Sequence, residues 1–270
     1  EEIHEAIYKL RVRGAPAIGC AAAIGLYACA LDIPYPSFED FYARFKQVKD
    51  YLASSRPTAV NLFWALDKME QCALDNRSKT QDKLMNALKR QALDIRQEDI
   101  DTCLEIGRHG AALLKDGDGI LTHCNAGSLA TAGCGTALAP VYVGIAERGL
   151  MNLKVHCDET RPLLQGARLT AFELMSEGVD TTVLCDNMAS SIMKDGRIDI
   201  IFVGCDRTAA NGDAANKIGT SGVAILAKHY GIPFYVCCPT STLDMNIVHG
   251  DGIKIEQRSP DEVSELWYKD

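Results

Sequence analysis

The chain carries the stretch IDIIFVGCD at residues 198–206. A short apolar run rich in Ile and Val, bounded by polar residues, is typical of a strand buried on both faces of a parallel sheet. Four more apolar runs follow the same pattern, at residues 119–122, 153–156, 181–184 and 234–236. Helical patterns lie between them, near residues 129–148, 168–177, 187–194 and 220–230. This alternation of strand and helix predicts an α/β fold with a Rossmann-like parallel sheet.

The first part of the chain has a different periodicity. Helical spacing of apolar residues predicts helices near residues 3–10, 17–31, 38–52, 59–75 and 81–114. We therefore expect a mostly helical N-terminal domain over residues 1–115 and a Rossmann-like α/β domain over residues 116–270. The chain starts without Met and stops on a charged segment. We expect it to lack its first segment and a C-terminal tail.

Composition narrows the class of protein. With 47% hydrophobic and 24% charged residues, the 270-residue chain has the composition of a soluble globular protein. A net charge of −8 argues against a nucleic-acid surface. The apolar stretch at residues 20–31 is too short to cross a membrane. A small anionic partner is compatible with this charge, because backbone N–H groups and a few cations can bind a phosphate.

Cysteine usage indicates the compartment. The eleven cysteines form no Cys-x-x-Cys motif, and most lie inside apolar runs. Free buried thiols in a reducing, cytoplasmic environment explain this pattern better than disulfides. The pairs His123-Cys124 and His156-Cys157 do not predict zinc, since adjacent ligands rarely close a tetrahedral site. We expect neither a metal nor an organic cofactor.

Polar or reactive residues follow each of the five predicted strands directly. These clusters occupy residues 123–125, 158–161, 186–187, 206–207 and 239–241. Ligands bind outside the carboxyl ends of the strands in an open α/β sheet. The sequence therefore predicts that all five clusters face one crevice.

Two of these clusters carry candidate catalytic groups. Cys124 lies at a strand-to-helix turn, where backbone N–H groups can stabilise a thiolate, although a buried core cysteine is the alternative. Asp206 ends the strand quoted above and is placed to act as an acid. Its alternatives are a helix cap or an ion pair with Arg207.

A glycine-bearing loop at residues 211–220 is a candidate anion site. The loop leads into a helix and contains Asn216 and Lys217, a combination that suits a phosphate but is not a Walker sequence. Arg13 and Arg56 offer cations on two further turns, with solvated surface groups as the alternative. The spacing of Gly133 and Gly135 is only a weak dinucleotide signal.

Five segments resemble the methylthioribose-1-phosphate isomerase family. They are RGAPAIG at 13–19, RPTAVNL at 56–62, THCNAG at 122–127, ETRPLLQGAR at 159–168, and residues 204–220. The resemblance implies an isomerase acting on a ribose 1-phosphate in methionine salvage, without a cofactor, as a homodimer. It implies Cys124 and Asp206 as the catalytic pair. It also implies a set of substrate-binding residues: Arg13, Gly14, Ala15, Arg56, Gln165, Asn216 and Lys217.

Three alternatives stay open at this point. The substrate can differ at C5, as in ribose 1,5-bisphosphate or 5-deoxyribose 1-phosphate. Apolar residues Val60, Leu62, Phe63 and Trp64 near Arg56 suit a methylthio group but suit a helix core equally well. A non-catalytic regulatory subunit that binds a sugar phosphate or nucleotide is the third alternative.

Overall fold

The computed structural model describes residues 1–255 and 257–264. Within them the chain forms two compact units. Unit 1 comprises residues 1–102 and 130–132, and unit 2 comprises residues 103–129 with the described residues from 133 onward. The division falls inside a long helix, whereas the boundary expected from the sequence lies just after it. That residues 1–115 and 116–270 form two separate domains stays a prediction.

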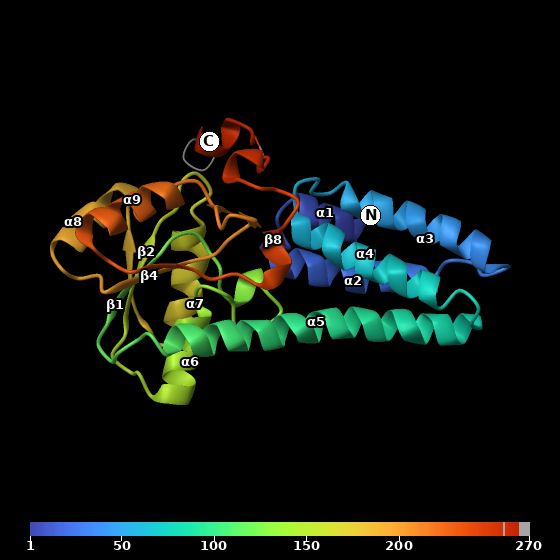
Figure 1. Cartoon of the computed structure of the whole chain (residues 1–270), viewed down its shortest axis with the longest axis horizontal. Coiled ribbons are helices and arrows are strands. Elements are labelled where there is room, and N and C mark those ends of the chain that lie inside the picture. The colour runs from blue at the N-terminus through green and yellow to red at the C-terminus, as the bar shows by residue number, and fades with distance from the viewer. Residues whose placement is uncertain (256, 265–270) are drawn as a thin grey trace. The chain divides into compact units, whose positions relative to one another are not determined.

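Unit 1 is helical, as the sequence predicts. Its helices are α1 (Glu2–Tyr8), α2 (Ala15–Leu31), α3 (Phe38–Ala53), α4 (Val60–Asp75) and the first two thirds of α5 (Gln81–Ala111). α2 packs against α3 and α4 (Figure 1). The core between them contains Leu26, Phe41, Phe45, Leu66 and Met69, all fully buried. The Ser37 side chain caps α3 by accepting the Asp40 N–H at 3.1 Å.

Unit 2 contains the predicted parallel sheet. Its five strands are β1 (Gly119–Thr122), β2 (Lys154–Asp158), β3 (Asp180–Leu184), β4 (Ile200–Val203) and β7 (Phe234–Val236). They pair in the order β3-β2-β1-β4-β7, all parallel. The expected Rossmann-like fold class is confirmed. β1 lies at the centre, which brings its carboxyl end beside those of β2 and β4.

Helices cover both faces of this sheet. α6 (Ala139–Arg148) and α7 (Ala171–Ser176) lie on one face, and α8 (Ala189–Lys194) and α9 (Thr220–Tyr230) lie on the other (Figure 1). Alternate residues of one strand serve the two cores: Phe202 packs with Val141 and Leu174, whereas Ile201 packs with Val223. Burial on both faces explains why β4 is continuously apolar, whereas the edge strand β3 is mostly exposed and contains Asp180, Thr181 and Thr182.

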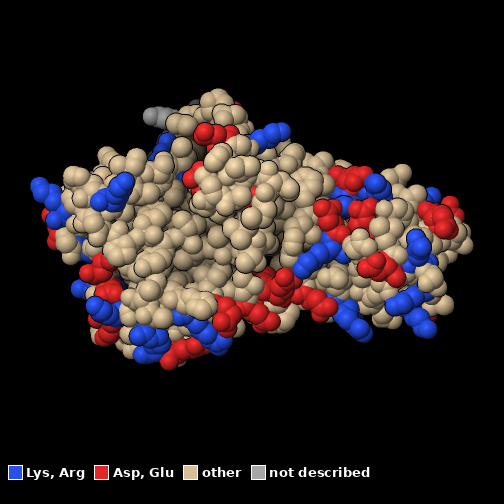
Figure 2. All heavy atoms as spheres, viewed as in Figure 1, with Lys and Arg blue, Asp and Glu red and all other residues tan. Residues whose placement is uncertain are grey.

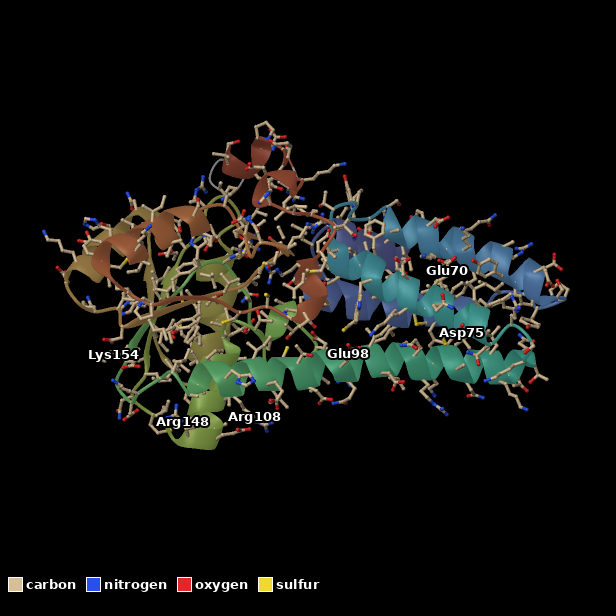
Figure 3. All side chains as sticks on the ribbon, viewed as in Figure 1. Glu70, Asp75, Glu98, Arg108, Arg148 and Lys154 are labelled. Atoms are coloured by element: carbon tan, nitrogen blue, oxygen red, sulfur yellow. The ribbon has the colours of Figure 1, made fainter. Side chains whose placement is uncertain are left out.

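The end of α5 belongs to unit 2 and is tied to α6. Arg148 of α6 donates to the carbonyls of Ala111 and Leu114, the latter at 3.1 Å, and Arg108 pairs with Glu147 at 3.0 Å (Figure 3). A cation at a helix C-terminus satisfies carbonyls that have no partner within the helix.

Two features differ from the sequence-based expectation. The helix expected from residue 129 begins only at Ala139, after a 3-10 turn at Ser128–Ala130 and a loop. Gly135 has φ 92° in that loop, a conformation that a helix does not contain. A second small sheet also forms, in which β5 (Arg207–Ala209) pairs with β6 (Ala214–Ala215) and β8 (Leu243–Asp244). A short helix, α10 (Asp261–Ser264), follows near the end of the described chain.

The surface of the described residues carries charges of both signs, as expected of a chain with 24% charged residues (Figure 2). On the face drawn in Figure 2, Lys and Arg are interspersed with Asp and Glu. Among the described residues, no helix combines the length and the apolar character that crossing a membrane requires.

Candidate active site

Cys124 follows β1 directly and has a strained backbone. Its φ is 72°, in the left-handed region that residues other than Gly seldom adopt. The Cys124 N–H donates to Thr160 Oγ1 at 2.8 Å, and the Thr170 hydroxyl donates to the Cys124 carbonyl at 2.6 Å. Both peptide groups of this residue are therefore fixed by side chains from other segments. Strain of this kind is concentrated at functional sites.

A buried carboxylate holds the loop after Cys124. Glu173 of α7 accepts the Ser128 N–H at 2.8 Å, the Leu129 N–H at 2.9 Å and the Asn125 amide at 3.1 Å. A Cβ at Gly127 would lie 1.8 Å from the Glu173 carboxylate, so only glycine fits there. The loop owes its shape to α7, which is distant in the sequence.

His123 lies beneath this loop, buried against Asp158. Its Nδ1 is 2.9 Å from Asp158 Oδ2, and its Nε2 is 2.8 Å from the Ile218 carbonyl. Burial alone would lower the pKa of His123, but the hydrogen bonds to these two acceptors raise it above its usual value. An imidazolium donates to both acceptors, so Asp158 and the Ile218 carbonyl hold the ring in place.

The candidate anion loop joins this network at Ile218. Asn216 Nδ2 donates to Thr220 Oγ1 at 3.1 Å, and that hydroxyl donates to the Lys217 carbonyl at 2.7 Å. Lys217 is half-buried and forms no ion pair with the described residues. The cation and the start of α9 are thus held by the same loop, as the sequence predicts for an anion site.

Asp206 lies just beyond β4 and is exposed. Its N–H donates to the Ala215 carbonyl at 2.8 Å, so that it enters β5 rather than capping a helix. The neighbouring Arg207 pairs with Asp244 at 3.6 Å. A Cβ at Gly204 would lie 2.8 Å from the Ala126 side chain. The segments that carry Cys124 and Asp206 therefore leave the sheet side by side.

Asp186 completes the cluster at the ends of β1, β2 and β3. Its carboxylate accepts the backbone N–H groups of Thr160 and Arg161, both at 2.7 Å. Ligand atoms of His123, Asp158 and Asp186 lie within 4.8 Å of one another, as a metal site would need. Hydrogen bonds already engage the His123 ring and both Asp186 oxygens, so the set serves as a polar network. Only Asp158 Oδ1 is buried there without a partner.

The implied substrate-binding residues are distributed over both units. Gln165 lies in unit 2, and its Oε1 is buried with no hydrogen-bond partner among the described residues. Arg13, Gly14, Ala15 and Arg56 belong to unit 1. Gly14 precedes α2 with φ 92°, and its Cβ would lie 2.5 Å from the Ala130 carbonyl.

The apolar residues near Arg56 are partly core. Leu62 is fully buried in the core of unit 1, and Trp64 packs against that core with Lys68 4.1 Å above its ring. Phe63 is 37% exposed. The helix-core interpretation therefore holds for Leu62 and Trp64, whereas Phe63 is available to other contacts.

Sequence reasoning missed two residues that shape the site, Glu173 and Thr170, whose contacts with the Cys124 loop join residues 44 to 48 apart in the chain. Thr160, which also fixes Cys124, belongs to the cluster predicted at residues 158–161. Glu173 resembles an ordinary helical surface acid in the sequence. The nearest signal in the sequence is Gly127, since a glycine in a loop can mark a site that another group approaches closely.

Comparison with known proteins gives consistent results. The chain matches the model of the Initiation factor 2 subunit family over residues 11–269. It is 63% identical to a methylthioribose-1-phosphate isomerase of Symbiobacterium thermophilum over 268 residues, 99% of this chain and 74% of that protein. It is 58% identical to a 5-deoxyribose 1-phosphate isomerase of Petrotoga mobilis, over 97% of this chain and 75% of that protein.

A solved structure agrees over nearly the whole chain. The crystal structure of 5-methylthioribose 1-phosphate isomerase from Pyrococcus horikoshii superposes with a TM-score of 0.89 at 44% identity, covering 97% of this chain and 73% of that one. These matches extend over nearly the whole chain. The chain belongs to the Initiation factor 2 subunit family.

Proposed function

We propose that the chain is an aldose–ketose isomerase that converts 5-methylthioribose 1-phosphate to 5-methylthioribulose 1-phosphate, a step of methionine salvage. The observation that carries most weight is the loop at Cys124. It holds a thiol in a strained conformation at the carboxyl edge of a parallel sheet, beside the strand that leads to Asp206. Relatives named as sugar 1-phosphate isomerases support the assignment.

Asp206 is assigned the ring-opening step. The anomeric oxygen of a sugar 1-phosphate is esterified, so the ring does not open as a free sugar does. A proton delivered to the ring oxygen lets the bond between that oxygen and C1 break. A carboxyl at the strand end is suited to this transfer.

Cys124 is assigned the hydrogen transfer that follows. The product needs one hydrogen moved from C2 to C1 and a carbonyl formed at C2. Cys124 either relays this hydrogen as a proton through an enol phosphate or stabilises a direct hydride shift.

Phosphate binding is assigned to Lys217 and Asn216 of unit 2. The Lys217 ammonium and the N–H groups at the start of α9 supply complementary charge. Gln165 has a buried oxygen without a partner and can accept from a sugar hydroxyl. We assign further phosphate and sugar contacts to Arg13, Gly14, Ala15 and Arg56, on the resemblance alone.

The chemical group at C5 decides between two candidate substrates. The high identity to both a methylthioribose-1-phosphate isomerase and a 5-deoxyribose 1-phosphate isomerase makes the deoxy sugar the second candidate. A phosphate at C5 would demand additional cations, so ribose 1,5-bisphosphate is the least favoured.

A panel of three sugars tests the proposal. We expect kcat/KM for 5-methylthioribose 1-phosphate to be highest, with 5-deoxyribose 1-phosphate within about 200-fold, since a small apolar group contributes about 1–3 kcal/mol to discrimination. Ribose 1,5-bisphosphate should be the poorest substrate. Binding of all three sugars without conversion of any would identify a regulatory subunit instead.

The compartment and the assembly are parts of the same proposal. No disulfide joins any of the eleven cysteines, all of which lie in the described part of the chain, and this suits a reducing cytoplasm. A homodimer is proposed from the resemblance. The partner molecule is a small sugar phosphate, and we propose neither a nucleic-acid nor a membrane partner.

A further inference from the structure

Two cysteines outside the proposed machinery lie on neighbouring strand ends. Cys205 follows β4 and Cys238 follows β7. These strands are parallel, with Val203 opposite Val236, and the Cys237 N–H donates to the Val203 carbonyl at 2.8 Å. The same register, continued by two residues, puts Cys205 opposite Cys238. The two side chains therefore emerge on one side of the sheet.

The two thiols are in contact. A hydrogen bond joins the Cys205 and Cys238 side chains, and both residues are half-buried. Neighbouring strands lie about 4.8 Å apart, inside the range of Cα separations that a disulfide spans without backbone movement. Cys205 Sγ is also 3.1 Å from Thr208 Oγ1. The register, continued past the strand ends, keeps the pair close to this range.

The two sulfurs are electronically unequal. The hydrogen bond from Cys205 lowers the pKa of Cys238 to about 6, although burial opposes this shift. The same bond, with burial, raises the pKa of Cys205. Burial raises the pKa of the adjacent Cys237 to about 12. Of the two sulfurs, Cys238 therefore loses its proton more readily, and Cys205 is the one that keeps it.

We propose that Cys205 and Cys238 form a redox-active dithiol, a modification site that hydrogen peroxide converts to an intramolecular disulfide. The Cys238 thiolate attacks one peroxide oxygen, the O–O bond breaks, and the departing hydroxide takes a proton to become water. Cys205 sulfur then attacks the Cys238 sulfenic acid. The hydroxyl group leaves with the Cys205 proton as a second water. Two thiols are oxidised and one peroxide is reduced.

The bridge would act on the backbone of Asp206. Cys205 Sγ lies 3.5 Å from the Ala215 carbonyl, and the Asp206 N–H donates to the same carbonyl at 2.8 Å. A bridge to Cys238 would change the position of the Cys205 sulfur relative to this carbonyl, next to Asn216. Any consequence for turnover rests on the proposed function, but the sulfur chemistry does not.

Peptide mass spectrometry of the full chain tests the proposal. The chain is treated with an equimolar amount of hydrogen peroxide at pH 7, and remaining thiols are alkylated. We expect a peptide cross-linked between Cys205 and Cys238, lighter by two hydrogen atoms and restored by dithiothreitol. Cys237→Ala, the matched control, should give the same cross-link. Oxidation of the exposed Cys185 without this cross-link would overturn the proposal.

Alkylation kinetics give a second readout without oxidant. In the wild type, the rate of Cys238 alkylation by iodoacetamide should rise with a midpoint near pH 6. Cys205→Ser should move that midpoint upward, because a serine hydroxyl cannot reproduce the geometry of the longer thiol contact. In this variant, peroxide should leave a sulfenic acid on Cys238 that dimedone traps. A midpoint near the ordinary thiol value of about 8.5 in the wild type would contradict the proposed pairing.

Discussion

At the scale of single residues, the buried histidines of unit 2 should respond to pH in opposite directions. His123 and His156 are both 2% exposed. Acceptors at both ring nitrogens raise the pKa of His123, whereas burial, reinforced by the Arg197 charge, lowers the pKa of His156. The two residues are therefore matched in burial and differ in their partners.

The sign follows from linkage between protonation and folding. A raised folded-state pKa stabilises the fold fully below the unfolded value of about 6.5, and this contribution is lost as pH rises through the raised pKa. A lowered pKa stabilises the fold above about 6.5, and that contribution is lost as pH falls through the lowered pKa.

We expect His123→Asn to lower the free energy of unfolding more at pH 6 than at pH 9. His156→Asn, the control, should lower it more at pH 9 than at pH 5. Urea unfolding of both variants and the wild type gives these differences. Equal losses for His123→Asn at both pH values would mean that the histidine is not held as an imidazolium.

Whether a site residue could be predicted from the sequence depended on its position relative to the strands. Cys124 and Asp206 could be singled out because polar residues that follow an apolar strand share the ligand-binding edge of a parallel sheet. Glu173 and Thr170 could not, because their roles depend on how α7 and the turn before it pack against a loop more than 40 residues earlier. Packing at that separation leaves no local pattern.

At the scale of elements, the start of α9 depends on a glycine. Gly219 has φ 101°, and a Cβ there would lie 2.7 Å from His123 Nε2. Gly222, three residues further along, has no positive φ and no atom within 4 Å of its Cβ position. The two glycines lie close together in the chain, but a Cβ would be crowded and strained at Gly219 and would meet nothing at Gly222.

Gly219→Ala should therefore destabilise the chain by about 1–3 kcal/mol, as expected for a strained left-handed residue. It should also raise KM, since it displaces His123 from the loop that carries Lys217. Gly222→Ala should stabilise by about 0.5–1 kcal/mol through helix propensity and leave KM unchanged. Chemical denaturation measures the change in the free energy of unfolding, and steady-state kinetics measure KM. If Gly219→Ala changed neither quantity, the steric link between this loop and His123 would be wrong.

The elements themselves were predictable to different degrees. The strands β1 and β7 and the helix α9 begin and end at the predicted residues, because apolar runs and glycines delimit them. The helix predicted from residue 129 was wrong at its start, since Gly133 and Gly135 form a loop there. The small sheet was not anticipated, because strands of two or three residues have no periodicity to detect.

At the scale of the whole molecule, the proposed catalytic residues lie in unit 2. Cys124, Asp206 and the loop of Lys217 all lie there, whereas the implied contacts Arg13 and Arg56 lie in unit 1. The fold class could be predicted because helical spacing of apolar residues gives way to short apolar runs near residue 116. The family supports the isomerase assignment and also contains initiation-factor subunits, so conversion of substrate is the property that separates the alternatives.

The most direct measurement is the rate at which 5-methylthioribose 1-phosphate becomes the ketose, followed by the NMR signal of C1, in the wild type and two variants. We predict turnover by the wild type and at least about a hundredfold lower kcat in Cys124→Ser and in Asp206→Asn. The exposed controls Cys185→Ser and Asp195→Asn should keep the wild-type rate. No conversion by the wild type, or near-normal conversion by either site variant, would contradict the account.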